Sequence, residues 1–153
     1  MASNKYNIQQ VTLSAFYHST EDPNKVRQAL LNVVPKDLRS EVSFEESIVS
    51  GYYGNTIGIL TLKFKSKKAE RVFTYVLCSL NATDKAIFSA TLSNRVGVKN
   101  SIVFLRLSKQ DAYLGQLSLM DGDDIIKLSA TVKGVRTFEE LKKYIDEVLS
   151  SCA

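Results

Sequence analysis

Alternating apolar and polar residues predict four β-strands along the chain, and a turn signal adds a fifth. In the first of them Val11 and Leu13 share one face, with Thr12 and Ser14 on the other. A period of two is typical of a strand that has one buried and one exposed face. Glycine and asparagine in residues 51–55 mark a turn, so the second and third strands are expected to form a hairpin. The predicted strands cover residues 8–17, 42–50, 56–65, 101–108 and 124–133.

A period near 3.6 predicts a helix directly after the first strand. Asp22 is expected to cap this helix, and Pro23 occupies the first helical position, where a missing N–H costs nothing. Val26 and Leu30 lie on its apolar side, and Pro35 ends it.

The second half of the chain carries further helical patterns. Ser66 is expected to cap a helix whose apolar residues between 69 and 80 follow helical spacing closely. Another helix is expected from Thr83 or Asp84 to about residue 95, and a short helical turn within 109–115. The last helix opens with the capping box Thr137-Phe138-Glu139-Glu140.

The order of these elements predicts an α+β fold. Helices and hairpins are interspersed, so we expect a single mixed or antiparallel sheet of about five strands, with helices packed mainly on one face. The sequence contains no internal repeat, low-complexity tract or linker. We therefore expect one domain over residues 1–153, with an ordered core at about 7–150.

Composition adds little about the partner but bears on the compartment. A net charge of +4 permits an anionic partner without demanding one. We see no apolar run long enough to cross a membrane and no apolar leader at the N-terminus, so no membrane association is expected. Cys78 and Cys152 lie far apart, and two cysteines are expected to give neither a disulfide framework nor a zinc site. A reducing, cytoplasmic compartment is the simplest expectation.

The sequence shows no recognisable catalytic constellation. His18 is the one histidine, and the common nucleotide-binding, metalloprotease and hydrolase motifs are absent. Cys78 lies off the core side of its helix, and nothing marks it as an activated nucleophile. The acidic residues 121–124 look like a metal site only at the level of a dipeptide, and Asp-Gly is a strong turn signal. We expect a protein that is not an enzyme and has no cofactor.

Basic residues on the exposed sides of the predicted strands favour a binding function. Cations that neutralise phosphates, beside aromatic rings on which bases stack, are typical of proteins that read single-stranded RNA. The alternative is an ordinary solvated face, with Glu45 or Glu46 pairing with Lys63. The residues predicted to share the uncovered face are Lys63, Lys65, Arg106, Lys127, Phe16 and Phe104.

A second basic group lies at the start of a predicted helix. Lys67, Lys68 and Arg71 occupy its first turns, where the helix dipole disfavours cations by a few tenths of a kcal/mol. Lys67 and Arg71 lie one turn apart, opposite the apolar side, and are expected to be exposed. Cations held against the dipole hint at a bound anion.

One segment resembles a known protein family. Residues 104–115, Phe-Leu-Arg-Leu-Ser-Lys-Gln-Asp-Ala-Tyr-Leu-Gly, are similar to a motif of an archaeal family of small predicted RNA-binding proteins, some of them described as exosome subunits. Residues 51–55 and 124–127 add weaker similarities, although Thr56 stands where the family favours proline. The resemblance spans roughly residues 8–133. It implies a fold like that of ribosomal protein L-five and a role in RNA processing or degradation.

The resemblance also implies site residues around the fourth strand. Arg106, Lys109, Gln110 and Tyr113 match the family motif, and the first three converge where a short helix begins, as phosphate ligands do. In the alternative interpretation Arg106 pairs internally with Asp111 or Asp124, and Tyr113 packs against the protein.

The resulting hypothesis is a non-catalytic RNA-binding protein, an accessory to an RNA-degrading complex such as the exosome. The alternative is a protein–protein interaction subunit of a larger complex that does not contact RNA. The predicted RNA-binding residues are Lys63, Lys65, Lys67, Lys68, Arg71, Arg106, Lys109, Gln110 and Tyr113.

Overall fold

The computed structural model describes residues 6–51, 53–97 and 99–152. Its strands are β1 (Asn7–His18), β2 (Glu45–Ser50), β3 (Thr56–Lys65), β4 (Ile102–Ser108) and β5 (Ile125–Lys133). Its helices are α1 (Pro23–Leu31), α2 (Ser66–Ser79), α3 (Ala82–Ala90), α4 (Lys109–Tyr113) and α5 (Phe138–Ser150), with short 3-10 helices η1 (Lys36–Glu41) and η2 (Leu92–Asn94).

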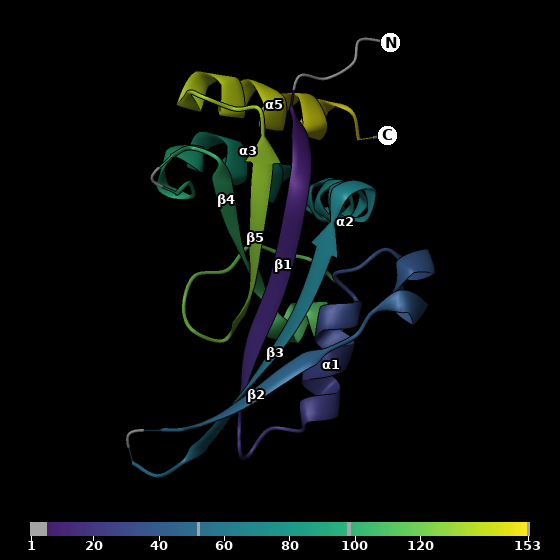
Figure 1. Ribbon diagram of the computed structural model, residues 1–153, viewed down its shortest axis with the longest axis vertical. Coiled ribbons are helices and arrows are strands. Elements are labelled where there is room, and N and C mark those ends of the chain that lie inside the picture. The colour runs from purple at the N-terminus through teal and green to yellow at the C-terminus, as the bar shows by residue number, and fades with distance from the viewer. Residues whose placement is uncertain (1–5, 52, 98, 153) are drawn as a thin grey trace.

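The five strands form one sheet in the order β2-β3-β1-β5-β4 (Figure 1). Every neighbouring pair runs antiparallel, which confirms the α+β prediction and decides between the mixed and antiparallel alternatives. The long strand β1 lies in the centre, where Leu13 faces Leu62 on one side and Leu128 on the other. Strands distant in sequence are thereby brought into one surface.

Helices cover one face of the sheet and leave the other uncovered. α1 and α2 pack behind β1 and β3, while α5 crosses the end of the sheet where β1 begins (Figure 1). The alternate residues that face the helices, such as Val11, Leu62 and Leu105, are fully buried. They join α2 residues such as Phe73 in one hydrophobic core. Burial of this apolar surface is the main force that holds the helices on the sheet.

Helix starts follow local side-chain chemistry, with one correction. The side chain of Asp22 accepts a hydrogen bond from the Asn24 N–H and caps α1, as predicted. The predicted capping box of α5 is also present. Ser66 does not cap α2: the cap position is Lys65, which makes no side-chain bond, and Ser66 is itself the first helical residue.

Two helices end earlier than predicted. α1 stops at Leu31, before Pro35. α3 starts after the cap Asn81 and stops at Ala90, and the short helix η2 follows it.

The hairpin between β2 and β3 is confirmed, with Gly54 at φ +81° in its turn. Tyr52, part of the predicted turn, lies outside the described residues. Glycine is the residue that adopts such a φ at low cost.

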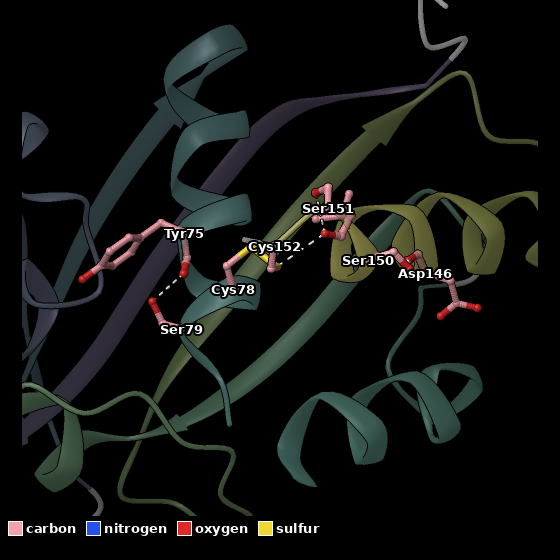
Figure 2. Close-up of a disulfide and its surroundings, with 8 residues drawn as sticks. Tyr75, Cys78, Ser79, Asp146, Ser150, Ser151 and Cys152 are labelled. Atoms are coloured by element: carbon pink, nitrogen blue, oxygen red, sulfur yellow. Dashed lines mark hydrogen bonds between the residues drawn. A yellow bond between two sulfur atoms is a disulfide. The ribbon is translucent and has the colours of Figure 1, made fainter. Parts of the chain in front are cut away.

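The two cysteines are joined by a disulfide, which corrects the expectation from sequence. Cys78, near the end of α2, bonds Cys152, two residues beyond α5, across a sequence separation of 74 (Figure 2). The bond ties the end of the chain to the helix layer behind the sheet. Cysteine usage therefore no longer argues for a reducing compartment.

Candidate nucleic-acid interface

The face of the sheet that no helix covers, called the open face here, gathers polar, cationic and aromatic side chains from all five strands. On β1, β3, β4 and β5 they alternate with the buried core residues, whereas every residue of β2 is exposed. Strand pairing sets them side by side in rows, so residues far apart in the sequence become neighbours. Its residues on the four longer strands include Gln10, Thr12, Ser14, Phe16, Thr61, Lys63, Lys65, Phe104, Arg106, Lys127 and Ser129.

Arg106 and Lys127 form the centre of the cationic part of this face. They are directly opposite each other on β4 and β5, and both are exposed. The Lys127 ammonium lies 5.0 Å from the centre of the Phe104 ring, a cation–π contact. Among the described residues neither cation takes part in an ion pair. Two like charges at adjacent positions repel, so an anion between them would be favoured.

The alternative pairing of Arg106 is wrong, because both candidate carboxylates have other partners. Asp111 accepts a hydrogen bond of 2.6 Å from the Ser118 hydroxyl. Asp124 forms an ion pair of 2.8 Å with Lys109. The guanidinium of Arg106 is therefore left for solvent or a ligand.

Two cavities meet at this cation pair. One, the cationic pocket, has a volume of about 500 Å³ and is lined by Arg95, Arg106, Lys127, Phe104 and Asp121, among others. The other, the apolar groove, has a volume of about 990 Å³, and its apolar lining residues are Ala15, Phe16, Val49, Ile57, Ile59 and Ile125. Three cations against one carboxylate give the cationic pocket a net positive charge.

Lys63 and Lys65 lie on the open face toward the other end of β3. Both are exposed, and with Lys68 they line a cavity of about 380 Å³. Glu45 on β2 approaches Lys63 to 3.4 Å, as the alternative interpretation anticipated. An exposed pair of this kind is worth little and is readily exchanged for a phosphate contact.

The basic residues at the start of α2 are largely neutralised by the protein itself. Glu41 pairs with Lys68 at 2.7 Å, and Asp37 holds Arg71 through two hydrogen bonds of 2.7 and 2.8 Å. The Arg71 guanidinium lowers the pKa of Asp37, and Asp37 in turn raises the pKa of Arg71. Both carboxylates come from η1, while Lys67 is exposed without an ion pair among the described residues. This group differs from Arg106 and Lys127, which have no such partner.

Lys109, which the sequence predicted as an RNA-binding residue, is instead buried and paired within the protein. Its side chain is 9% exposed, and its ammonium contacts Glu21 at 2.9 Å, Asp124 at 2.8 Å and the Phe16 carbonyl at 2.9 Å. Burial alone would lower the pKa of Lys109, but the hydrogen bonds to Asp124 and Glu21 outweigh it and raise that pKa. Lys109 thus joins β1, α4 and the start of β5 as a structural ion cluster.

The other two predicted residues of α4 lie at the surface. Gln110 is exposed at one wall of the apolar groove. Tyr113 is 41% exposed, and the Lys25 ammonium stands 5.9 Å from its ring centre. Tyr113 faces a separate cavity beside α1, so the structure does not bring it together with Arg106.

Sequence reasoning missed two residues of the site. Lys127 was placed on the correct face but not among the binding residues, since its pairing with Arg106 depends on the strand register. Arg95 follows η2, where no periodic pattern indicates its direction, and its guanidinium lies 5.9 Å from the Phe88 ring centre. Only the fold brings it to the cationic pocket.

Acidic residues 121–124 form the turn before β5. Gly122 has a φ of +107°, and Asp124 is engaged by Lys109. Within residues 6–51, 53–97 and 99–152, no group of three or more histidine, cysteine or acidic side chains is arranged to hold a metal ion. None of the helices in these ranges combines the length and apolar character that crossing a membrane requires.

Comparison with known proteins identifies the family. Protein AF2318 of Archaeglobus fulgidus, a DUF54 structure, superposes with a TM-score of 0.76 and 28% identity, covering 93% of this chain and 99% of that one. An uncharacterized protein of Methanocaldococcus jannaschii, MJ0213, is 31% identical over 121 residues, which are 78% of this chain and 81% of the relative. RNA-binding protein PAB1135 of Pyrococcus abyssi is 28% identical over 130 residues, 84% of each chain.

The family model described as "RNA binding" matches residues 10–132, a span that begins within β1 and ends within β5. This confirms the archaeal family that residues 104–115 resemble. The chain belongs to the RNA-binding family.

Proposed function

We propose that this protein is a non-catalytic RNA-binding protein that binds phosphates with the open face of its sheet. The observation that carries the proposal is the exposed pair Arg106 and Lys127, which has Phe104 beside it and no ion-pair partner within the part of the chain that the structure describes. The match to the RNA-binding family supports it. In the cell the protein would act in the cytoplasm as an accessory subunit in RNA processing or degradation, in association with the exosome.

Affinity for RNA would come mainly from five cations. Lys63 and Lys65 lie on β3, and Arg95, Arg106 and Lys127 surround the cationic pocket. Binding releases counterions from the phosphates, so the affinity depends on salt. For single strands the slope of log K against log salt is roughly −0.7 per phosphate, or about −3.5 for five.

The test is a titration of fluorescently labelled single-stranded RNA at several salt concentrations. We expect binding at low salt and a slope near −3.5. No binding at low salt, or binding that does not change with salt, would overturn the proposal.

The non-catalytic part of the proposal rests on the single histidine and the absence of known catalytic motifs in the sequence. Incubating RNA with the protein, with and without a divalent metal, tests it. We expect intact RNA under both conditions. Cleavage that co-purifies with the protein and is lost in a site-directed variant would show that the protein is an enzyme.

A second candidate function is a protein–protein interaction subunit that does not touch RNA. The observation in its favour is β2, an edge strand that exposes Ile48 and Val49 at 58% and 44%. Exposed apolar edge strands are ready to pair with another chain. Under this alternative, complexes isolated with the protein survive nuclease treatment, and Arg106→Glu leaves their assembly intact.

A further inference from the structure

Phosphate contacts alone do not account for the apolar groove beside the cation pair. Phe16 lines it and is 55% exposed, although it belongs to the long central strand β1, which ends two residues later at His18. Ile59 on β3 pairs with Phe16 on β1, and Ile57 lies two residues earlier on the same side of β3. Large apolar side chains gathered on an uncovered sheet face commonly mark a binding site.

The groove lies so close to the phosphate-binding cations that a single nucleotide could contact both. Ser14 pairs with Lys127 in the register between β1 and β5, and Phe16 is two residues further along the same face. Diagonal neighbours of this kind are about 7–8 Å apart. Arg106 and Lys127 line both the groove and the cationic pocket, so a ligand can fill both cavities continuously.

The charged side chains that line the groove determine which part of it a phosphate can occupy. Arg106 and Lys127 line one part of it, and Asp123 and Asp124 line another. Lys109 pairs with Asp124 and also with Glu21, a third acidic lining residue, whereas Asp123 has no ion pair among the described residues. A phosphate is therefore attracted to the cationic part and repelled from the acidic part, which leaves the apolar floor for an uncharged group.

We propose that the apolar groove holds an unpaired nucleobase of single-stranded RNA, stacked on Phe16, while the adjoining phosphate binds Arg106 and Lys127. This inference rests on the proposed RNA-binding function and adds the form of RNA that is bound. A base within a duplex is stacked and paired, so it cannot enter the groove unless it is extruded. The floor is mostly aliphatic and aromatic, so it selects a π-face and tolerates any of the four bases.

An apolar peptide is the competing occupant of such a groove. A peptide would gain affinity from Ile57, Ile59 and Phe16 but has no need of the unpaired cations at the groove's edge. The juxtaposition of groove and cations favours a nucleotide, because a nucleotide carries both an apolar base face and a negative charge.

The experiment compares Phe16→Ala with a matched control, Ile48→Ala. Ile48 is equally exposed, at 58%, but lies on β2 and points to the opposite side of the sheet. The probe is a short oligoribonucleotide with one 2-aminopurine, used single-stranded and annealed into a perfect duplex. Fluorescence polarisation reports affinity, and 2-aminopurine intensity reports stacking.

We expect the natural protein to bind the single strand at least tenfold more tightly than the duplex and to change the 2-aminopurine intensity. Loss of a base–aromatic stack should weaken single-strand binding by about 5- to 150-fold in Phe16→Ala. The intensity change should disappear, while the salt slope stays the same because the cations are intact. Phe16→Leu, which keeps an apolar side chain without an aromatic face, should behave like Phe16→Ala, and Ile48→Ala like the natural protein.

The outcomes separate this inference from the proposed function. Salt-dependent binding that is equal for single strand and duplex, and unchanged by either Phe16 variant, overturns the base-binding groove but leaves RNA binding standing. Failure of the natural protein to bind any RNA at low salt overturns the proposed function itself. Thermal melting of each variant confirms that it is folded, which is expected because Phe16 is exposed.

Discussion

The two faces of the sheet use the same residue types for different purposes. On the side of the helices, Arg71 is held by Asp37, Lys68 by Glu41, and Phe73 is fully buried in the core. On the open face, Arg106 and Lys127 have no ion pair within the described parts of the chain, and Phe16 is 55% exposed. Arg71 and Lys68 thus have carboxylate partners within the protein, whereas Arg106 and Lys127 are left for a ligand.

This difference separates residues that stabilise the fold from residues that bind. An arginine with a bidentate carboxylate partner already has the interaction that a phosphate would offer, so it gains little from RNA. An exposed cation without a partner contributes little to folding, and replacing it should leave the protein intact. Substitutions on the two faces should therefore affect different measurements.

Removal of the disulfide should have the largest effect, and on stability alone. In the chain-entropy model a crosslink across 74 residues stabilises the folded state by about 4 kcal/mol. We expect Cys78→Ala/Cys152→Ala to lower the free energy of unfolding by up to that amount in urea denaturation. RNA affinity should not change, since the bond lies among the helices on the covered side of the sheet (Figure 2). A large loss of RNA affinity in the folded variant would show that the two faces are coupled.

Replacing Lys109 should have the next largest effect. In Lys109→Met the two carboxylates lose their buried partner, but Glu21 and Asp124 are 30% and 49% exposed and can be solvated. We therefore expect a loss of about 2 kcal/mol in unfolding free energy, below the usual cost of breaking a fully buried pair. The salt slope of RNA binding should stay unchanged. A slope less negative by about 0.7 would instead restore Lys109 as a phosphate ligand.

The same cluster predicts a dependence of stability on pH. The folded-state pKa of Lys109 is raised, so its contribution is complete below about pH 10 and is lost as the pH rises through the raised value. For Glu21, burial acts to raise the pKa, but hydrogen bonds from the His18 N–H and Lys109 outweigh it and lower the pKa. Its contribution is complete above about pH 4 and is lost as the pH falls further. Lys109→Met should flatten the alkaline limb of unfolding free energy against pH; an unchanged limb would contradict this role.

The sequence predicts the elements of this fold well because each carries a local signal. Alternation located β1, β3, β4 and β5, the turn at residues 51–55 located β2, and the capping box located the start of α5. The ends were less accurate: the proline at position 35 indicated where α1 must stop, but the helix stops at Leu31. The disulfide depends on two residues that only the packing of α2 against the end of the chain brings together, and no local pattern contains that information.

The site could be predicted only to the level of the face. Periodicity places Lys63, Arg106 and Phe16 on the uncovered side, since a strand alternates regardless of its neighbours. Which cations remain unpaired depends on carboxylates from elsewhere in the chain. The sequence predicted Lys109 as a phosphate ligand because it could not show that the fold places Glu21 against its ammonium.

The cation pair itself gives the next prediction. Arg106→Ala/Lys127→Ala removes two phosphate contacts, so the salt slope should become less negative by about 1.4 and affinity at 0.1 M salt should fall roughly 25-fold. Unfolding free energy should change by less than about 0.5 kcal/mol, as for exposed positions. Lys68→Ala/Arg71→Ala is the control with the same charge change and should leave the slope nearly unchanged. Equal effects of the two double variants would show that total charge, and not the open face, determines binding.

The smallest expected effect is a gain in binding, and it tests whether a carboxylate partner is what withholds a cation from RNA. Glu41→Gln releases Lys68, which lines the same cavity as Lys63 and Lys65 and would extend the cationic surface of the open face. The salt slope should become more negative by about 0.7, and affinity at 0.1 M salt should rise about fivefold. Loss of the exposed ion pair should cost less than about 1 kcal/mol of stability.

Asp37→Asn is its matched control, because it releases Arg71, which does not line that cavity. Both variants change the net charge by one unit, so any effect of overall charge is the same in the two. If the open face determines binding, Glu41→Gln should change the slope and Asp37→Asn should not. If both variants bind RNA equally well, the start of α2 belongs to the interface, and the division between a covered and an open face does not describe how this protein binds.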